Sequence, residues 1–278
     1  MLRRGDSQRV AELMRDTAAA ELLPRFRNLA EGDIREKRPG DVVTVADVAS
    51  EQRLASGLAK ILPGVPVVGE EAVEADPGLL DLIGRRGESC WIVDPLDGTS
   101  NFSKGRDWFA MIVCLVHDTD TVAGWILDVP NDRMAIAVVG EGSTLDGQSI
   151  RLAPSEQAPR GYVGFSMRKA LDRQLAPERR RRLGGLDTRN CAGREYIDLL
   201  AEQREFNLYR RTKPWDHAAG ALLIREAGGL AERFDGSPYG PAGSQEGGII
   251  AAVSPDVMVE VRSVLEAVQI PLLAAKPT

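Results

Sequence analysis

The amino-acid sequence predicts an α/β protein in which an α+β lobe is followed by an α/β lobe. Two patterns support this prediction. Strand-like apolar runs gather in the first half of the chain, whereas strands and amphipathic helices alternate in the second half. Segment 141–155 is the best boundary between the lobes, which gives predicted domains at 1–145 and 146–278. The 278 residues suffice to bury a sizeable core.

The first half begins with two predicted helices and continues with strands. Apolar residues recur at helical spacing over residues 7–23, where Ser7 takes the N-cap position. The same spacing over 47–61 ends at Pro63 and Gly64. Apolar runs predict five strands, the last of them after a Pro-Asn-Asp turn, at 65–68, 90–93, 109–117, 121–129 and 133–139.

The second half alternates between the two kinds of element. Strands are expected near 161–165, 206–210 and 247–253, and helices at 168–183, 194–203, 216–227 and 255–268. Four consecutive arginines at 179–182 lie on a polar helix of an acidic protein. We therefore expect a solvated helix end there rather than a surface for nucleic acid.

Composition narrows the classes of function. The chain has 35 Lys and Arg against 41 Asp and Glu, a net charge of −6, and 4 Trp, 4 Tyr and 6 Phe. This balance argues against direct nucleic-acid binding, which depends on excess positive charge. Two histidines leave little scope for a histidine-based metal site. Metal chemistry would therefore use carboxylates, which favour hard cations such as Mg²⁺.

The sequence also indicates a cytoplasmic protein. Its three cysteines, Cys90, Cys114 and Cys191, are far apart and form no CxxC pair, which predicts buried thiols in a reducing compartment. The N-terminal residues show no apolar signal core, and no apolar stretch approaches about 18 residues. We expect no membrane segment.

The most informative segment is the loop after the strand that ends at Val93. Two aspartates, Asp94 and Asp97, stand three positions apart in a turn that Gly98 makes tight. Such a turn would direct both carboxylates and the Leu96 carbonyl at one point, an oxygen-only site for Mg²⁺. Thr99 to Asn101 would cap a short helix whose free N–H groups hold a phosphate. Taken alone, this segment could equally be a structural Asp-Gly turn with no role in binding a metal or phosphate.

Four other acids also stand at the ends of three predicted elements. Glu70 and Glu71 end an apolar strand and point to opposite sides, so only one is expected in a shared site. Asp47 and Asp216 each begin a predicted helix, where an N-cap is the simplest role. A single carboxylate-lined site explains these positions better than several independent turns and caps.

Together these segments resemble the inositol monophosphatase family, the lithium-sensitive, Mg²⁺-dependent phosphatases of sugar phosphates and nucleotides. The resemblance is carried by four ordered segments and a weaker fifth: 41–47, 69–71, 91–102, 215–229 and 145–150. It implies a five-layer α-β-α-β-α sandwich, a homodimer and two to three Mg²⁺ ions per active site.

The resemblance also implies roles for individual residues. The first cation would be held by Glu70, Asp94 and the carbonyl of Leu96, and the second by Asp94, Asp97 and Asp216. A weaker third cation would lie near Glu70. Thr99, hydrogen-bonded to Asp47, would act with Glu70 to activate a metal-bound water for in-line attack. The phosphate would be bound at Gly98, Thr99 and Ser100.

Haloacid-dehalogenase-type phosphatases have a similar motif, D-x-D-G-T, whose first Asp becomes phosphorylated. Here Asp94 and Asp97 are one residue further apart, which would turn the first Asp to another side of the loop. The spacing therefore argues against a covalent mechanism.

The substrate is the part of the resemblance that fits least well. Inositol-specific members carry a glutamate about seven residues before the Trp-Asp pair, where this chain has Tyr209, Arg210 and Arg211. The arginines, together with Arg194, would favour a second negative group on the substrate. Alternatively, these three arginines are exposed to solvent or paired with nearby acids. The candidate substrate-binding residues are Ser166, Ala192, Tyr209 and Arg210.

Three functional hypotheses follow. The first is a Mg²⁺-dependent phosphomonoesterase acting on inositol monophosphate or a similar polyol phosphate. The second keeps this chemistry with 3′-phosphoadenosine 5′-phosphate, fructose 1,6-bisphosphate or histidinol phosphate as the substrate. The third is a scaffold associated with RNA polymerase and antitermination, which would not need the complete acid set. That set is complete here, so we favour a phosphatase acting on a small phosphorylated metabolite.

Overall fold

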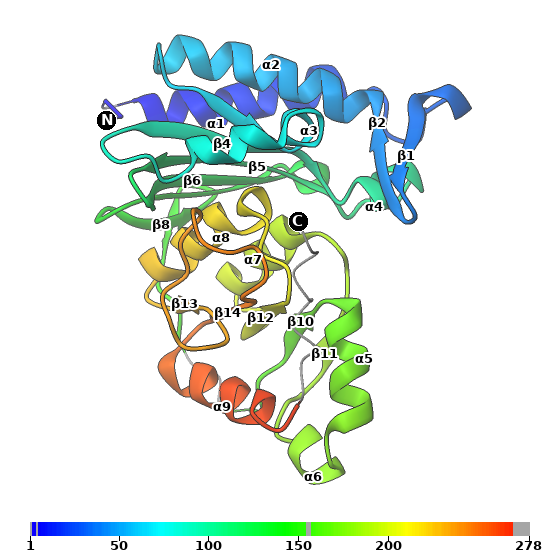
Figure 1. Cartoon of the computed structure of the whole chain (residues 1–278), viewed down its shortest axis with the longest axis vertical. Helices are drawn as coiled ribbons and strands as arrows, with labels where there is room; N and C mark the ends of the chain where they lie inside the picture. The colour runs from blue at the N-terminus through cyan, green and yellow to red at the C-terminus, as the bar shows by residue number, and fades with distance from the viewer. Residues whose placement is uncertain (1, 4, 154–156, 269–278) are drawn as a thin grey trace.

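Three helical layers and two β-sheets alternate along the long axis of the molecule (Figure 1). The computed structural model describes residues 2–3, 5–153 and 157–268. From one end of the molecule the layers are α1 with α2, a seven-stranded sheet, α7 with α8, a five-stranded sheet, and the group α5, α6 and α9. This order confirms the predicted α/β class and its α-β-α-β-α layering.

The first layer consists of α1 (Asp6–Thr17), a π-helical continuation (Ala18–Leu22) and α2 (Val45–Ile61). Both predicted helices are therefore present. The predicted N-cap at Ser7 is wrong, because Gly5 is the N-cap of α1 and Ser7 lies inside the helix. Gly5 has a φ of 92°, and the Asp6 carboxylate accepts from the Arg3 N–H at 2.8 Å. A glycine in the left-handed region and a carboxylate that bonds backwards thus begin the helix.

The seven-stranded sheet runs in sequence order, with one parallel pair, β3 with β4, and antiparallel pairs elsewhere. Helices cover both of its faces, which is why the inner strand β5 is buried at every position but its last. Its strands are β3 (Val67–Gly69), β4 (Ser89–Asp97), β5 (Ala110–His117), β6 (Asp120–Asp128), β7 (Arg133–Val138), β8 (Gly142–Leu145) and β9 (Gln148–Ile150).

The middle layer contains α7 (Ala192–Leu200) and α8 (Pro214–Glu226). Small residues let these helices approach closely. A Cβ added at Gly124 of β6 would lie 2.9 Å from the Cα of Ala219, and one at Gly220 would lie 2.2 Å from the Tyr196 ring. The middle layer is therefore packed against both the first sheet and its own neighbouring helix with no room for larger side chains.

The five-stranded sheet has the order β11-β10-β12-β14-β13. It pairs β10 in parallel with β11 and β12, and β14 antiparallel with β12 and β13. Its strands are β10 (Gly161–Val163), β11 (Leu186–Asp187), β12 (Phe206–Tyr209), β13 (Leu230–Glu232) and β14 (Ile249–Ala252).

The last layer comprises α5 (Phe165–Gln174), α6 (Pro177–Arg180) and α9 (Pro255–Leu265). The single helix predicted at 168–183 is wrong, because the chain leaves the helical conformation at Leu175 and Ala176. Both residues are extended, as expected just before Pro177. The predicted strands and the other helices of this half are present with ends shifted by a few residues.

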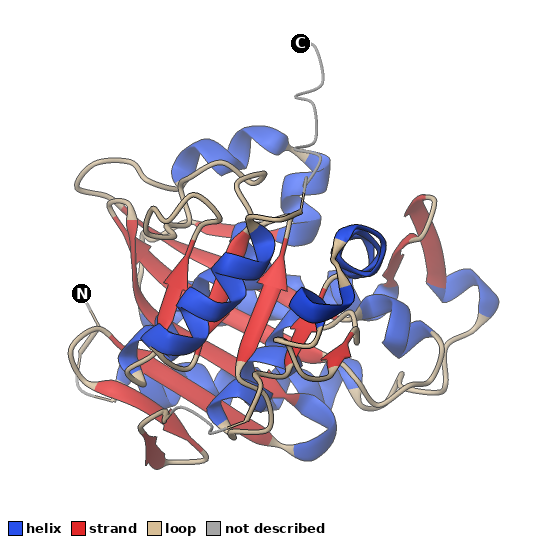
Figure 2. Ribbon diagram, turned by 90° about the horizontal axis from the view of Figure 1, so that it is seen from below, coloured by secondary structure: helices blue, strands red, loops and turns tan. Residues whose placement is uncertain are grey.

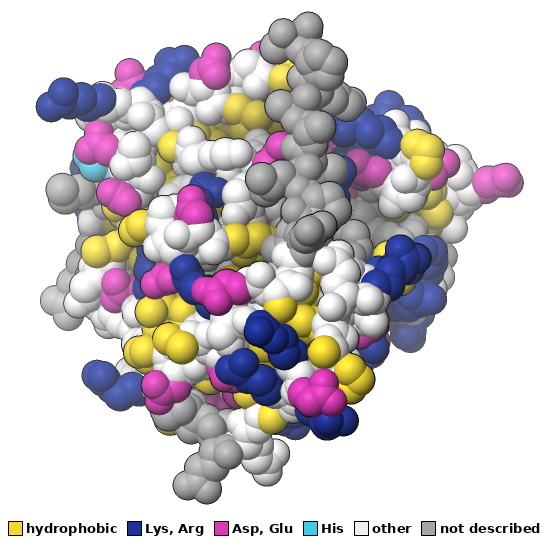
Figure 3. All heavy atoms as spheres, turned by 60° about the horizontal axis from the view of Figure 1, so that its bottom comes forward, with side chains coloured by type: hydrophobic (Ala, Val, Ile, Leu, Met, Phe, Trp, Pro, Cys, Tyr) yellow, Lys and Arg dark blue, Asp and Glu magenta, His cyan; other side chains and the backbone are white. Residues whose placement is uncertain are grey.

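Lys and Arg side chains are interspersed with acids on the face formed by this last layer (Figure 3). Three of the four consecutive arginines reach carboxylates: Arg180 to Asp172 at 3.7 Å, Arg181 to Glu178 at 3.5 Å and Arg182 to Glu260 at 2.6 Å. This arrangement agrees with the prediction of a solvated helix end.

Several short elements were not predicted. A hairpin of β1 (Ile34–Arg38) and β2 (Asp41–Thr44) projects from one side of the layered body (Figures 1 and 2). The short helix α3 (Glu70–Ala75) after β3 was not predicted either, whereas α4 (Thr99–Ser103) after β4 is the short helix that the sequence predicted there. Beyond the predicted division at 145/146, β9 still pairs with β8 of the first sheet. Residues 154 and 155 of the predicted boundary segment lie outside the described residues, and the division itself stays a prediction.

Two further expectations concern cysteines and membranes. All three cysteines are buried and free, as predicted. Within the described part of the chain, no helix combines the length and apolar character needed to cross a membrane.

Candidate metal and phosphate site

Acids from distant parts of the chain converge at one edge of the first sheet. Asp94 and Asp97 lie at the end of β4, Glu70 begins α3 after β3, and Asp216 lies in the first turn of α8. Because β3 and β4 are parallel, their carboxyl ends share this edge. One oxygen from each of Glu70, Asp94 and Asp216 lies within 4.8 Å of the others. Oxygen-only donors at this spacing fit a hard divalent cation.

The turn after β4 has the tight geometry that the sequence predicted. Gly98 has a φ of 87°, and a Cβ there would lie 2.8 Å from the Trp108 carbonyl oxygen, so the position requires glycine. The Asp94 carboxylate accepts from the Leu96 N–H at 3.0 Å. Gly98 is also the N-cap of α4, whose first residues are Thr99 and Ser100 rather than cap residues.

Asp47 connects α2 to this turn. The prediction that Asp47 is the N-cap of α2 is wrong, because Thr44 takes that place. Asp47 is the third helical residue, and it forms a capping box with Thr44. One Asp47 oxygen accepts from the Thr44 N–H and hydroxyl at 2.8 and 2.6 Å. Its other oxygen is 3.0 Å from the Thr99 hydroxyl, so the Thr99–Asp47 contact that the resemblance implies is present.

Lysines neighbour the acids of the site. Glu70 Oε1 lies 3.0 Å from Lys213 Nζ and 3.9 Å from Lys37 Nζ. Glu71 instead bonds Lys37 at 2.9 Å, so only Glu70 of the pair joins the acid cluster, as expected. Lys37 comes from the unpredicted β1–β2 hairpin, and nothing in the local sequence marked it.

Glu51 is a second supporting residue that no local sequence pattern predicted. Its two oxygens accept from the N–H groups of Glu71 and Ala72, both at 2.9 Å, and so anchor the start of α3. The glycine at position 69 was the one local indication of this contact, because a Cβ there would lie 2.2 Å from Glu51 Cδ. Glu51 therefore positions the element that carries Glu70.

Burial raises the pKa of the clustered carboxyl groups. Asp94 is 2 % exposed, and its pKa lies well above the ordinary value, because of burial first and then the charges of Glu70, Asp97 and Asp216. Burial likewise raises the pKa of Asp97 to about 6, of Asp47 to about 7 and of Asp216 to about 8. A bound cation would relieve this repulsion, which gives the cluster a strong preference for positive charge.

Two cavities adjoin at the site. The smaller one, about 190 Å³, is lined by the four acids and by Leu96, Gly98, Thr99 and Ser100. The larger one, about 840 Å³, is lined by residues of the β1–β2 turn, α5, α7 and the segment before α8. They share four lining residues: Gly40, Asp97, Asn190 and Asp216. A ligand could therefore place one group at the acids and extend into the larger cavity.

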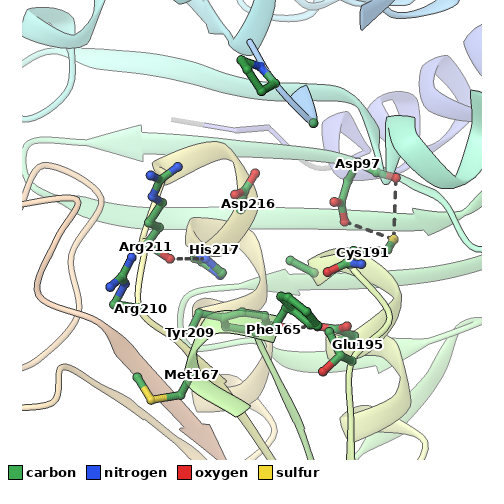
Figure 4. A pocket seen from close by; sticks show the side chains of 16 residues that line it. Asp97, Phe165, Met167, Cys191, Glu195, Tyr209, Arg210, Arg211, Asp216 and His217 are labelled. Atoms are coloured by element: carbon green, nitrogen blue, oxygen red, sulfur yellow. Dashed lines mark hydrogen bonds between the residues drawn. The ribbon is translucent and has the colours of Figure 1, made fainter. Parts of the chain in front are cut away.

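Figure 4 shows the larger cavity from close by. Arg210 and Arg211 lie on one side of it, Asp97 and Cys191 on the opposite side, and Tyr209 and Phe165 below. Of the predicted substrate residues, Ala192, Tyr209 and Arg210 line this cavity. Ser166 is the second residue of α5, and its side chain is outside what the structure describes.

Arg194 does not line the larger cavity, although the sequence suggested that it would contact a second negative group of the substrate. Its Nε is 3.0 Å from Asp128 Oδ2, and its guanidinium carbon lies 4.1 Å from the centre of the Trp108 ring. The side chain is almost fully buried, so it joins α7 to the first sheet instead of binding a ligand.

A buried polar network forms the base of the larger cavity. Tyr209 donates to the carboxylate of Glu195, which is 3 % exposed and whose pKa burial raises to about 8. His217 Nε2 lies 3.0 Å from the Arg211 carbonyl oxygen, and burial lowers the pKa of His217 to about 3. A neutral His217 must donate through Nε2 to that carbonyl, which fixes the backbone that carries Arg210 and Arg211.

The fold and the site define a layered α-β-α-β-α protein with an acidic cluster suited to a divalent cation and an adjoining cavity. The model of the inositol monophosphatase family matches residues 7–269, and the chain belongs to this family. The predicted resemblance is thereby confirmed.

Individual relatives agree with this assignment. The chain is 33 % identical over 220 residues to inositol monophosphatase 2 of Solanum lycopersicum, which covers 74 % of this chain and 80 % of that one. It is 30 % identical over 239 residues to the Nus factor SuhB of Pseudomonas aeruginosa, with 79 % and 83 % covered. The solved structure of an IMPase from Thermotoga maritima matches with a TM-score of 0.73 at 24 % identity, covering 92 % and 96 %.

Proposed function

We propose that this chain is a Mg²⁺-dependent phosphomonoesterase that hydrolyses inositol monophosphate or a similar polyol phosphate. One observation carries the proposal: oxygens of Glu70, Asp94 and Asp216 lie within 4.8 Å of one another beside the Thr99 hydroxyl and the cavity lined by Gly98 and Ser100. Cation ligands and phosphate donors side by side are what hydrolysis of a phosphate ester requires.

The residues at the site suit two to three Mg²⁺ ions. Carboxylates of Glu70, Asp94, Asp97 and Asp216 and the Leu96 carbonyl would hold them, all of them oxygen donors. When bound, such cations neutralise the phosphate and lower the pKa of water, so that in-line displacement needs no covalent enzyme intermediate.

Thr99 and Asp47 would handle the proton. The Thr99 hydroxyl has one hydrogen and two acceptors in reach, Asp47 Oδ1 at 3.0 Å and the Leu96 carbonyl oxygen at 2.8 Å. Because burial raises the pKa of Asp47 to about 7, its carboxyl can gain or lose a proton near neutral pH. The pair could therefore orient an attacking water and accept its proton, with Glu70 on the other side of the site.

The turn after β4 would hold the phosphate. Gly98, Thr99 and Ser100 line the acid-lined cavity, and backbone N–H groups there would face the phosphate oxygens. This arrangement keeps the ester phosphorus next to the cations while its alcohol extends into the larger cavity.

An Asp94→Asn variant tests the proposal. We expect Mg²⁺-dependent phosphate release to fall at least about 100-fold, because an amide oxygen cannot replace the charge at the centre of the cluster. The matched control is Glu74→Gln, which removes an exposed acid that pairs with Arg38. Near-normal turnover by Asp94→Asn, with circular dichroism like that of the wild type, would refute the proposed chemistry.

The larger cavity favours a second candidate substrate with the same chemistry. Its volume of about 840 Å³, the 61 % exposed Phe165 ring and two arginines suit a nucleotide or sugar bisphosphate. We would compare phosphate release from inositol 1-phosphate, 3′-phosphoadenosine 5′-phosphate, fructose 1,6-bisphosphate and histidinol phosphate, with and without Li⁺. A clear preference for a bisphosphate would select this candidate over the polyol phosphate.

A scaffold role remains a hypothesis of a different class, since one relative is named a Nus factor. A scaffold would have no use for the acid set, and this chain keeps all of it. If Asp94→Asn abolished a cellular phenotype as fully as deletion of the whole chain, the phenotype would depend on phosphatase activity.

A further inference from the structure

Asp97, at the end of β4, is held from the C-terminal lobe. The Gly193 N–H donates to Asp97 Oδ2 at 2.6 Å. Cys191 Sγ lies 3.2 Å from the same oxygen and 3.6 Å from the Asp97 carbonyl oxygen (Figure 4). None of these contacts involves Oδ1. The first turn of α7 therefore holds one oxygen of Asp97 in place. Because the carboxylate is rigid, this also fixes the direction in which the other oxygen points.

Close packing makes these contacts possible. A Cβ at Gly193 would lie 2.9 Å from Ala110 Cβ and 3.2 Å from Ile112 Cδ1, so only glycine lets α7 approach the first sheet this far. A Cβ at Gly98 would lie 3.3 Å from Cys191 Cβ, which places the thiol directly under the metal-site turn. Cys191 is 1 % exposed and adopts an extended backbone as the N-cap of α7.

We infer that Cys191 and the Gly193 N–H are positioning groups for Asp97, which direct its Oδ1 at the second cation and so set the affinity of that cation. This inference rests on the cation site of the proposed function. A ligand whose second oxygen is already bonded loses less freedom when it binds a metal. The second cation would thus depend on α7 of the C-terminal lobe as well as on β4.

Two substitutions at Cys191 separate positioning from packing. Cys191→Ser keeps a donor of similar size, whereas Cys191→Ala removes the donor. We would titrate the metal-free proteins with Mg²⁺, and with Mn²⁺ as a spectroscopic substitute, by calorimetry and electron paramagnetic resonance. We expect Cys191→Ala to weaken the second site about 10-fold while the first changes less than about twofold, and Cys191→Ser to stay within about threefold of wild type at both.

Cys90→Ala is the matched control, because Cys90 is equally buried and lies in the apolar core. It should lower the melting temperature about as much as Cys191→Ala and leave both metal affinities unchanged. Equal second-site affinities for the wild type and Cys191→Ala would overturn the inference, and so would a Cys191→Ser variant as weak as the alanine variant.

Failure of this inference is distinguishable from failure of the proposed function. A wild-type protein that binds Mg²⁺ but releases phosphate from no ester would refute only the phosphatase proposal. A wild-type protein that binds no Mg²⁺ would overturn both. In an active enzyme, unchanged metal affinities in Cys191→Ala would refute only the positioning role.

Discussion

Several carboxyl groups of this protein are buried where their negative charge is unfavourable. Asp94 has three acidic neighbours, Glu70, Asp97 and Asp216, and Glu195 lies under the larger cavity. Each such group favours its protonated form unless a cation or a hydrogen-bond donor stabilises the ionised one. The same side chains that suit the site to cations therefore make the metal-free protein sensitive to pH.

Glu195 provides a test of this sensitivity, because it is not among the expected cation ligands. Its folded-state pKa of about 8 exceeds the ordinary 4.5, so its contribution to stability is complete below about pH 4.5 and is lost as pH rises through about 8. Glu195→Gln removes this titration. We expect the free energy of unfolding of the wild type to fall relative to that of Glu195→Gln between pH 5 and 8, measured by urea unfolding in the presence of a chelator.

Glu178→Gln is the control, because Glu178 is exposed on α6. Its curve should run parallel to that of the wild type at every pH. Parallel curves for Glu195→Gln as well would show that the Glu195 carboxyl does not change its protonation on folding.

Among the elements, α8 carries the most demanding packing. It holds Asp216 in its first turn and lies between the two sheets, where Gly220 faces the ring of Tyr196 on α7. Tyr196 in turn contacts His217 Nδ1 through its hydroxyl at 3.3 Å. A change in the spacing of α7 and α8 would therefore move both Asp216 and the α7 turn that holds Asp97.

Gly220→Val should lower the free energy of unfolding by about 1–3 kcal/mol or more, because its side chain would overlap the Tyr196 ring. It should also weaken Mg²⁺ binding by shifting Asp216. Urea unfolding and calorimetric titration would measure the two effects. Gly185→Ala, at an exposed position with open space around its Cβ, should change neither; a Gly220→Val protein as stable as wild type would contradict the packing argument.

Sequence patterns identified those elements whose signals are local. The second helix was found because its apolar spacing ends at Pro63 and Gly64, and the β4 turn because Gly98 follows paired aspartates. The helix predicted at 168–183 was wrong because the break before Pro177 outweighed the apolar periodicity. The β1–β2 hairpin was missed because its exposed, charged strand β1 has no apolar alternation.

The acid set of the site was also predictable, since each acid ends or begins an element. Its supporting residues were not, because Glu51, Lys37 and Cys191 act through contacts with residues 20 to 94 positions away. Such contacts follow from the packing of whole layers. Of the two alternatives left open for Arg194, pairing with an acid is the one present, but its partner Asp128 lies on another layer and was not foreseen for the same reason.

At the scale of the whole molecule, the first sheet and the middle helices meet at the site. Asp94 belongs to β4 of the first sheet and Glu70 begins α3 directly after β3, whereas Asp216 and the Asp97 anchor belong to the middle helices. A cation bound between them stabilises only the folded arrangement of both. We therefore expect Mg²⁺ to raise the melting temperature of the entire protein in a single transition.

Differential scanning calorimetry with increasing Mg²⁺ would measure this effect, with about 2.7 kcal/mol expected at 100 times the dissociation constant. Asp94→Asn should be insensitive to Mg²⁺ and, in a chelator, more stable than the wild type, since it removes a buried carboxyl group whose ionisation is unfavourable there. Two separate transitions, with only one moved by Mg²⁺, would show that the lobes unfold independently.

The division of the two cavities has an evolutionary consequence. The acid-lined cavity depends on the turns after β3 and β4, whereas the wall of the larger one comes from α5, α7 and residues 209–211. Substitutions in that wall would change the shape of the larger cavity without displacing Asp94 or Glu70. In the proposed phosphatase, lineages descended from one ancestor would thus exchange leaving groups while the acid cluster is inherited intact.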